Sequence, residues 1–150
     1  DRLVVLNRGR IEQEGPPLAV YDAPVSRFVG AFLGSPPMNF LPARVAQGRA
    51  LGQGLLRPVE AKGQDGDVLL GLRPHDLSIR EDAPDLHVDV DVVEPMGFEA
   101  YAHGRVGDSR VVVRLEGSEL GRVKAGSTVP LGFAPDKLRL FDANTGKAWV

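Results

Sequence analysis

The first residues combine apolar runs and turn residues in a pattern that predicts a β-hairpin. Residues 3–6 are uniformly apolar, which is typical of a strand buried on both faces. Gly9 can supply the positive φ of a tight turn, and residues 10–14 alternate weakly, as a return strand would. The sequence contains no obvious further sheet partner for residues 3–6. We therefore expect this strand to pair with a second copy or to be poorly ordered.

Proline and glycine divide the next residues into two short helices. Pro16 or Pro17 suits a first helical turn, which predicts a helix over residues 18–21. A second helix is predicted over residues 25–33, where apolar side chains recur at helical spacing on one face. The members of that face are Val25, Phe28, Val29, Phe32 and Leu33. Gly34 follows them and is placed to cap the helix at its C-terminus.

After residue 35 the helical period disappears, and short β-like runs with turn residues between them take its place. Two prolines follow Ser35, and we place the boundary between segments 1–34 and 35–150 there. The predicted strands cover residues 40–47, 55–58, 68–73, 86–94, 98–106, 110–115, 127–133 and 138–141. A single helical turn is expected at Asp76. Many short strands at this spacing indicate a mainly β fold, either a barrel or a sandwich.

Composition narrows the range of partners and chemistry. The 150 residues carry a net charge of −2, so no nucleic-acid partner is expected, because such proteins normally have a basic excess. The chain has no cysteine, which excludes disulfides, thiolate nucleophiles and zinc–thiolate sites. No apolar run approaches the roughly 18–20 residues of a membrane span.

Charge is distributed unevenly along the predicted strands. Residues 81–99 contain seven acidic residues and no Lys or Arg, whereas residues 105–124 contain five basic residues and three acidic ones. Adjacent antiparallel strands would place these opposite charges across from each other. The same pattern is also typical of a simple solvated face.

One strand carries residues of the types that bind metals. His87, Asp89 and Asp91 alternate on the strand predicted over residues 86–94 and would share one face. Neighbours on one face of a strand run parallel, however. The opposite face is purely apolar, as in an ordinary half-buried strand: Leu86, Val88, Val90 and Val92. We therefore expect no metal site. His75 and His103 are isolated, and no nucleophile motif occurs, so no catalytic residue is predicted.

Nucleotide chemistry is also missing from the chain. The nearest approach to a phosphate-binding loop, residues 146–148, has Ala148 where a hydroxyl is needed. We expect no cofactor and no ATP hydrolysis by this chain. The aromatic residues Tyr101, Phe133, Phe141 and Trp149 suggest either a stacking platform or ordinary core, and the acidic balance favours the core.

Four phrases of the sequence, in order, resemble the ATP-binding subunits of ABC importers for carbohydrates. Residues 35–41, Ser-Pro-Pro-Met-Asn-Phe-Leu, resemble the maltose, multiple-sugar and glycerol-phosphate type. Residues 71–77, Gly-Leu-Arg-Pro-His-Asp-Leu, resemble that family's Gly-Xaa-Arg-Pro-Glu-His phrase, although His-Asp replaces Glu-His. Residues 92–99 resemble its Val-Glu-Xaa-Xaa-Gly-Xaa-Glu phrase, and residues 131–141 resemble its closing strand pair.

This resemblance implies a fold and a set of partners. Residues 1–34 correspond to the last hairpin and helices of a nucleotide-binding domain, and residues 35–150 to a regulatory β-barrel of the OB and TOBE class. The intact subunit would bind ATP and Mg²⁺, form a homodimer and join transmembrane permease subunits. It would lie on the cytoplasmic side, at the inner face of the membrane. A regulatory protein is a further possible partner.

The same resemblance directs attention to two turns as a candidate interaction surface. Its members are Arg73, Pro74, Asp76, Gly97, Phe98 and Glu99. The alternative is that Pro74 and Gly97 only shape turns and that Arg73 only pairs with an acid. A second hypothesis for the whole chain is a barrel that binds a small oxyanion such as molybdate, with Ser127 and Thr128 as candidate donors.

Overall fold

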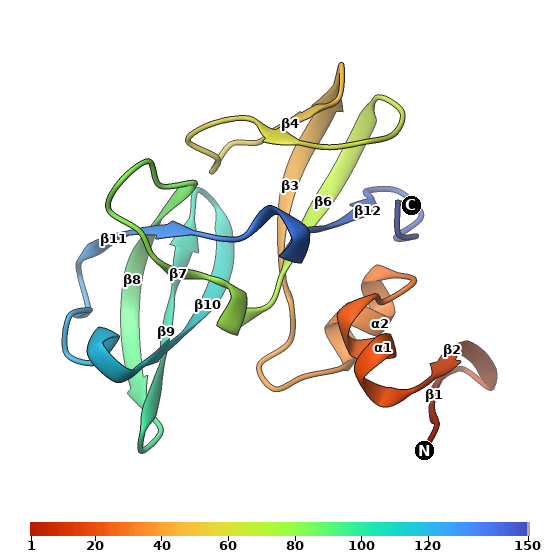
Figure 1. Cartoon of the computed structure of the whole chain (residues 1–150), viewed down its shortest axis with the longest axis horizontal. Coiled ribbons are helices and arrows are strands. Elements are labelled where there is room, and N and C mark those ends of the chain that lie inside the picture. The colour runs from red at the N-terminus through yellow and green to blue at the C-terminus, as the bar shows by residue number, and fades with distance from the viewer. Residues whose placement is uncertain (150) are drawn as a thin grey trace.

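Two curved antiparallel sheets of five strands each, with a hairpin and two short helices beside them, make up the protein (Figure 1). The computed structural model describes residues 1–149. In the first sheet the strand order is β12-β6-β3-β4-β5, and in the second it is β10-β9-β8-β11-β7. The mainly β fold with curled sheets confirms the predicted fold class.

The strands of the first sheet are β3 (Asn39–Ala46), β4 (Arg49–Leu51), β5 (Val59–Glu60), β6 (Gly66–Leu72) and β12 (Arg139–Asp142). Those of the second sheet are β7 (Ser78–Ile79), β8 (Leu86–Pro95), β9 (Glu99–Val106), β10 (Ser109–Glu116) and β11 (Thr128–Gly132). The hairpin and helices are β1 (Leu3–Asn7), β2 (Arg10–Gly15), α1 (Pro17–Asp22) and α2 (Arg27–Phe32). Three short 3₁₀ turns complete the fold: η1 (Pro74–Asp76), η2 (Gly117–Glu119) and η3 (Pro135–Lys137).

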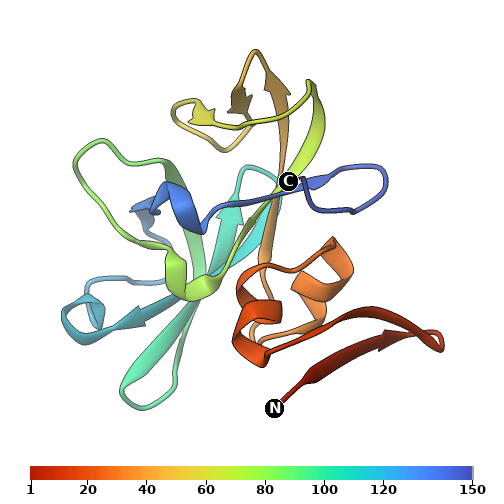
Figure 2. The ribbon, with the colours of Figure 1, turned by 45° about the vertical axis from the view of Figure 1, so that its right-hand side comes forward.

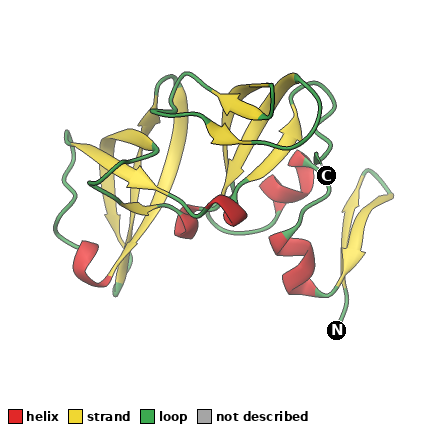
Figure 3. Ribbon diagram, turned by 45° about the horizontal axis from the view of Figure 1, so that its top comes forward, coloured by secondary structure: helices red, strands yellow, loops and turns green. Residues whose placement is uncertain are grey.

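The chain passes between the two sheets twice, each time through a 3₁₀ turn that begins with proline. It leaves β6 through η1 to reach β7, and it returns from β11 through η3 to β12. Figure 3 shows the two groups of strands side by side with these turns between them. Strand β12 then pairs with β6, which is distant from it in sequence.

A single apolar core joins the two sheets. Its largest fully buried side chains are Leu70, Leu72, Leu86, Leu115 and Leu131. Phe133 belongs to this core, Phe141 is also buried and Trp149 packs partly against it. Three of the four aromatic residues suggested for a stacking platform therefore pack inside the protein.

Strand β8 contains a bulge that changes which valine faces the core. The register with β9 shifts between Val90 and Val92, so that Val90 lies opposite Gly104 and Val92 opposite His103. A bulge inserts one residue and turns the following side chains to the other face. Val92 is consequently exposed and Val93 packs on the core, which corrects the prediction that Val92 continues the buried face.

The predicted strand over residues 55–58 is wrong. Leu55 makes only an isolated bridge to Leu86, and the segment is otherwise a loop packed against the second sheet. A side chain on Gly54 would overlap Val106, so the loop lies very close to β9. The pairing residues flank this loop instead, in the short strands β4 and β5, and β7 was also not predicted.

Some of the opposite charges pair across neighbouring strands, which is one of the two interpretations that the sequence left open. Arg105 on β9 pairs with Asp91 on β8 at 3.6 Å, and Arg114 on β10 pairs with Glu99 on β9. Arg122 pairs with Glu81 at 3.2 Å. These pairs are largely exposed, so each stabilises the sheet by only about 0.2–1 kcal/mol. None of the helices described is long and apolar enough to cross a membrane.

Residues 1–34, which we call the helical segment, have a small core of their own. Val5, Val20 and Val29 are buried together there, separately from the main core. The two sheets with their loops and 3₁₀ turns, residues 35–149, are called the barrel below. Figure 2 shows the β1–β2 hairpin reaching away from the barrel while the helices lie beside η1. Gly34 follows α2 with φ of +96°, as expected of a residue that ends a helix.

Two predictions for this segment need correction. β1 pairs with β2 and buries only Val5, while Val4 and Leu6 are exposed, so the strand is not buried on both faces. Along α2, Val29 is fully buried but Phe28 and Phe32 are partly or largely exposed. The apolar face of this helix is therefore only partly covered in the protein described here.

Candidate functional site

Arg73, at the end of β6, is buried where the helical segment meets the barrel. It is only 3% exposed. Its Nη1 donates hydrogen bonds to the carbonyls of Gly30 (2.9 Å) and Leu33 (2.7 Å), and its Nη2 donates to the carbonyl of Tyr21 (2.9 Å). The guanidinium also lies over the Tyr21 ring, 4.0 Å from its centroid. The structure thus contradicts the expectation that Arg73 is a surface contact.

Burial lowers the pKa of the Arg73 guanidinium, and nearby Tyr21, Asp76 and Asp22 act in the opposite direction. Arginine nevertheless remains protonated in proteins. The buried charge has no acid within ion-pair distance among the described residues, and its partners are helix carbonyls and an aromatic ring. The alternative that Arg73 pairs with an acid is therefore also incorrect.

Three further hydrogen bonds join the helical segment to the barrel. Arg139, on the strand next to β6, donates through Nε to the carbonyl of Asp22 at 2.8 Å. Close to the end of the chain, the backbone N–H of Ala148 donates to Val25 at 2.9 Å, and the N–H of Arg27 donates to Gly146 at 2.7 Å. The helical segment is therefore held both by arginine side chains and by backbone pairing.

The turn after Arg73 has the single helical turn predicted for it. Pro74 is buried, and the N–H of Asp76 donates to the carbonyl of Arg73 at 3.0 Å. His75 is more exposed and stacks on Tyr21, with the ring centroids 6.1 Å apart. Pro74 shapes the turn from inside the protein, so it is not part of an accessible surface, whereas Asp76 is only half-buried.

The second predicted turn forms an apolar knob, which we define as Met96 and Phe98 at the tip of the β8–β9 hairpin. Phe98 is 98% exposed, and Met96 is about half exposed. Gly97 has φ of +84°, and the N–H of Met96 donates to the carbonyl of Glu99 at 2.8 Å, which closes the turn. Exposed apolar side chains that lie next to one another mark a candidate interaction site, whereas a single one is ordinary.

The side chain of Glu99 on β9 is bonded to the neighbouring strand β10. Its carboxylate accepts a hydrogen bond from Arg114 Nε, and this bond raises the pKa of the Arg114 guanidinium. The two turns do not form one surface, because Arg73 and Pro74 are buried at the helical segment while Phe98 lies at a hairpin tip. Of the predicted interaction residues, Phe98 is the one that the structure leaves most open to a partner.

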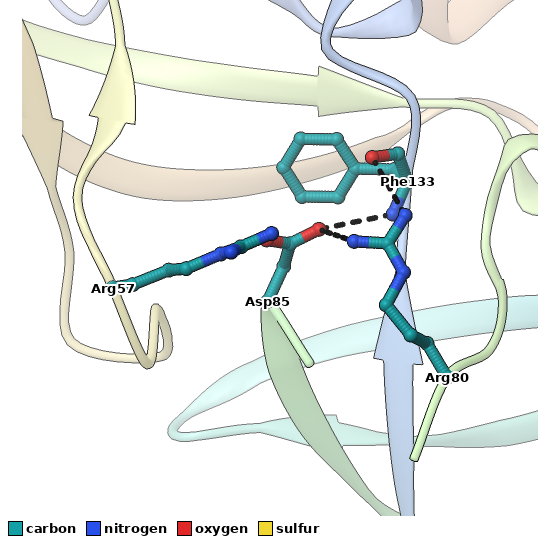
Figure 4. A network of polar contacts seen from close by, with 4 residues as sticks. All are labelled: Arg57, Arg80, Asp85 and Phe133. Carbon is teal, nitrogen blue, oxygen red and sulfur yellow. Dashed lines mark hydrogen bonds and ion pairs between the residues drawn. The ribbon is translucent and has the colours of Figure 1, made fainter. Parts of the chain in front are cut away.

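A polar cluster that sequence reasoning missed is centred on Asp85 (Figure 4). The Asp85 side chain is almost fully buried and accepts hydrogen bonds from Arg57 Nε (2.7 Å), Arg80 Nη1 (3.0 Å) and the N–H of Phe133 (3.1 Å). A side chain at Gly132 would collide with Arg80, so glycine there leaves room for the guanidinium. Only the apolar neighbour Leu86 hints at burial in the sequence.

The Asp85 cluster lines the floor of a cavity of about 240 Å³. Apolar side chains from the loop before β5, from β5, from η3 and from the residue after η3 complete its lining: Pro58, Val59, Pro135 and Leu138. Asp85 occupies both arginines, and Glu60 adds a second acid to the rim. The arrangement fastens the loop before β5 to the second sheet, and its charges largely balance.

The residues considered for metal or oxyanion binding have other partners. Asp89 accepts a hydrogen bond from the Thr128 hydroxyl at 2.8 Å, and Asp91 faces Arg105. Among residues 1–149, no group of three or more His, Cys, Asp or Glu residues is arranged to hold a metal ion. A carboxylate beside Thr128 repels anions, so the geometry there disfavours an oxyanion site.

Comparison with protein families gives two consecutive matches. Residues 34–77 match the model of the MalK OB fold domain, and residues 70–141 match the model of the TOBE domain. The overlap contains Arg73 and η1, the first passage of the chain between the two sheets.

Several curated proteins are similar over nearly the whole chain. The sn-glycerol-3-phosphate import ATP-binding protein UgpC of Cupriavidus pinatubonensis is 42% identical in an alignment 173 residues long. The alignment covers 98% of this chain and 44% of that protein. UgpC of Psychromonas ingrahamii is 39% identical, with coverage of 98% and 41%. The sulfoquinovosyl glycerol transport ATP-binding protein SmoE of Agrobacterium fabrum is 38% identical, with coverage of 99% and 43%. The chain spans less than half the length of these relatives.

Proposed function

Because the chain belongs to the family of ABC importer ATP-binding subunits and matches their MalK OB-fold and TOBE domains, we propose that it is the regulatory and dimerisation module of such a subunit. The observation that carries the proposal is the ordered pair of domain matches over residues 34–141. In this role the barrel binds other proteins and positions them. Catalysis belongs to a nucleotide-binding domain whose ATP and Mg²⁺ sites lie outside this chain.

The transported solute is proposed from the relatives. Those named above serve the import of sn-glycerol-3-phosphate and the transport of sulfoquinovosyl glycerol. Both are glycerol-linked solutes with an acidic group, so we place this subunit in an importer of that class. The permease subunits of the importer would then hold it at the inner, cytoplasmic face of the membrane.

The proposed partner of the barrel is a second copy of the subunit, with a regulatory protein as a further candidate. The apolar knob supports this role, because Phe98 is almost fully exposed at the tip of the β8–β9 hairpin. Aromatic residues on such protrusions often contribute most of the binding energy of an interface. Asp76, on η1, stays a predicted contact because it is only partly accessible.

Sedimentation equilibrium of the whole 150-residue chain tests the proposal. We expect a reversible monomer–dimer equilibrium that Phe98→Ser weakens by about tenfold or more, since it removes a central apolar contact. Leu51→Ser is the matched control: Leu51 is 55% exposed on β4, in the other sheet, and its loss should leave the equilibrium unchanged.

Three outcomes would contradict the proposal. The chain could stay monomeric up to millimolar concentration, the two serine variants could behave alike, or the chain could hydrolyse ATP unaided. The last would mean that this chain is itself a catalyst rather than a module that serves one.

A further inference from the structure

The two helices depend on the barrel because they are too short to stabilise themselves. Each contains six residues, well below the roughly 12–15 at which an isolated helix becomes marginally stable. The last four carbonyls of any helix also lack partners within the helix. Within the helical segment, the N–H of Ala23 reaches the Ala19 carbonyl of α1 and the N–H of Leu33 reaches the Val29 carbonyl of α2. Later carbonyls of both helices face the barrel and can accept hydrogen bonds from it.

Arginines of the barrel satisfy these carbonyls. Arg73 donates to Tyr21 near the end of α1, and to Gly30 and Leu33 at the end of α2. Arg139 donates to Asp22 of α1. Positive charge at the C-terminal end of a helix is favourable, and the planar guanidinium can reach several acceptors at once, which a lysine ammonium cannot do in the same geometry.

The approach of Arg73 is built into the backbone around it. Gly34 has positive φ, and a side chain there would lie 3.3 Å from Arg73 Nη1 and 3.2 Å from the Pro36 carbonyl. Those distances are too short for ordinary packing, so glycine lets the end of α2 close onto the guanidinium. On the other side, the Arg73 carbonyl accepts the N–H of Asp76 and begins η1.

Arg73 therefore touches both helix ends and the turn through which the chain passes to the second sheet. We propose that Arg73 is a coupling residue that links the ends of both helices to η1, so that a change in α2 is transmitted to η1. Arg139 supports the same joint from the neighbouring strand. The inference goes beyond the proposed function, because it concerns a contact within one chain and holds whether or not the chain dimerises.

Native-state hydrogen exchange of the whole chain tests the local part of the proposal. In Arg73→Met, the amides of α1 and α2 should exchange about tenfold faster or more, since three hydrogen bonds from a charged group to the helix ends are lost. The exchange rates of the amides that join β8, β9 and β10 by hydrogen bonds should change by less than about twofold. Arg44→Met is the matched control, because Arg44 makes an exposed ion pair with Asp67 on the first sheet.

Transmission is tested by disturbing α2 at its far end. The Ser26 hydroxyl accepts a hydrogen bond from the N–H of Val29 at the start of α2 (3.3 Å). Ser26→Ala should shift the amide resonance and exchange rate of Asp76 in the otherwise unaltered chain. In the Arg73→Lys background, which keeps the charge but loses the planar fork, the same substitution should leave Asp76 unchanged.

The results separate coupling from ordinary stabilisation. If Arg73→Met raises exchange equally in the helices and in β8–β10, Arg73 only stabilises the whole fold and the proposal fails. It also fails if Ser26→Ala reaches Asp76 equally well in the Arg73→Lys background. If Arg73→Met does not fold, the same comparison of exchange rates is made with Arg73→Lys and Arg139→Met, and equal protection across both regions again overturns the proposal.

Discussion

The three-stranded part of the second sheet and the helical segment reach their order in different ways. Strands β8, β9 and β10 follow one another in sequence, pair through short turns and bury a common face in the main core. The helical segment has only a small core, and the barrel supplies caps for both of its helices. The comparison teaches that short helices can be specified by residues that lie 40–117 positions away in the chain.

The largest loss of stability is expected from a substitution within the strands β8, β9 and β10. Gly104 on β9 has no room for a side chain, because a Cβ there would overlap the Asp89 carbonyl and lie 2.9 Å from Val88 Cγ1. Gly104→Ala should lower the free energy of unfolding of the whole chain by about 3 kcal/mol, as forced overpacking does. Urea denaturation followed by circular dichroism measures this loss.

The control for this change is Gly97→Ala, at a position with φ of +84° and open space around it. Backbone strain alone should destabilise the protein by only about 1 kcal/mol there. If the two variants lose equal stability, the close approach of β8 to β9 is not what requires glycine at position 104.

An intermediate loss of stability is expected from a substitution in the helical segment. Val29 is fully buried in the small core, and Val29→Ala removes two methyl groups, which should destabilise the segment by about 2 kcal/mol. Because the main core is separate, hydrogen exchange should accelerate in α1 and α2 and remain unchanged in β9 and β10. Equal acceleration throughout would show that the two cores unfold only together.

The smallest expected effect is a pH dependence of stability at Asp142. This residue lies close in sequence to the backbone hydrogen bonds that Gly146 and Ala148 make with the helical segment. Asp142 accepts hydrogen bonds from the N–H groups of Thr145 and Asn144, and these bonds lower the pKa of its carboxyl below the ordinary 3.8. Its stabilising contribution is therefore fully present above pH 3.8. It is lost as the pH falls through the lower folded-state value.

Thermal melts between pH 5 and pH 2 test this contribution. The wild-type chain should lose stability more steeply toward acid than Asp142→Asn, since the amide has no proton to gain. The exposed pair of Asp67 with Arg44 provides the control, because Asp67→Asn should leave the slope nearly as it is in the wild-type chain. Parallel slopes for the wild-type chain and Asp142→Asn would contradict the assignment.

The periodic strands and the two turn motifs followed directly from the sequence. Leu86, Val88 and Val90 alternate with polar residues, and that pattern alone identified a half-buried strand. The pattern could not reveal the bulge before Val92, because a bulge depends on the register of the partner strand. Nor could it distinguish residues 55–58 from a strand, since apolar residues in a packed loop look the same in one dimension.

The candidate site was predicted less well than the fold, for a related reason. Phe98, predicted to be a surface contact at a strand junction, is exposed, whereas Arg73, predicted to be a surface contact on a turn, is buried. Its burial depends on acceptors contributed by Tyr21, Gly30 and Leu33, which are distant in sequence. The Asp85 cluster was missed for the same reason, because its two arginines come from different loops.

Local pattern alone determined that this chain folds into short strands after a hairpin and two helices, because side-chain periodicity and turn residues act over a few positions. Only the tertiary structure decided which charges are buried, since a buried charge is tolerated only where distant groups supply its hydrogen bonds. Arg73 illustrates the difference: the sequence places it at the end of a strand, and the packed helices turn it into the joint between two parts of the molecule.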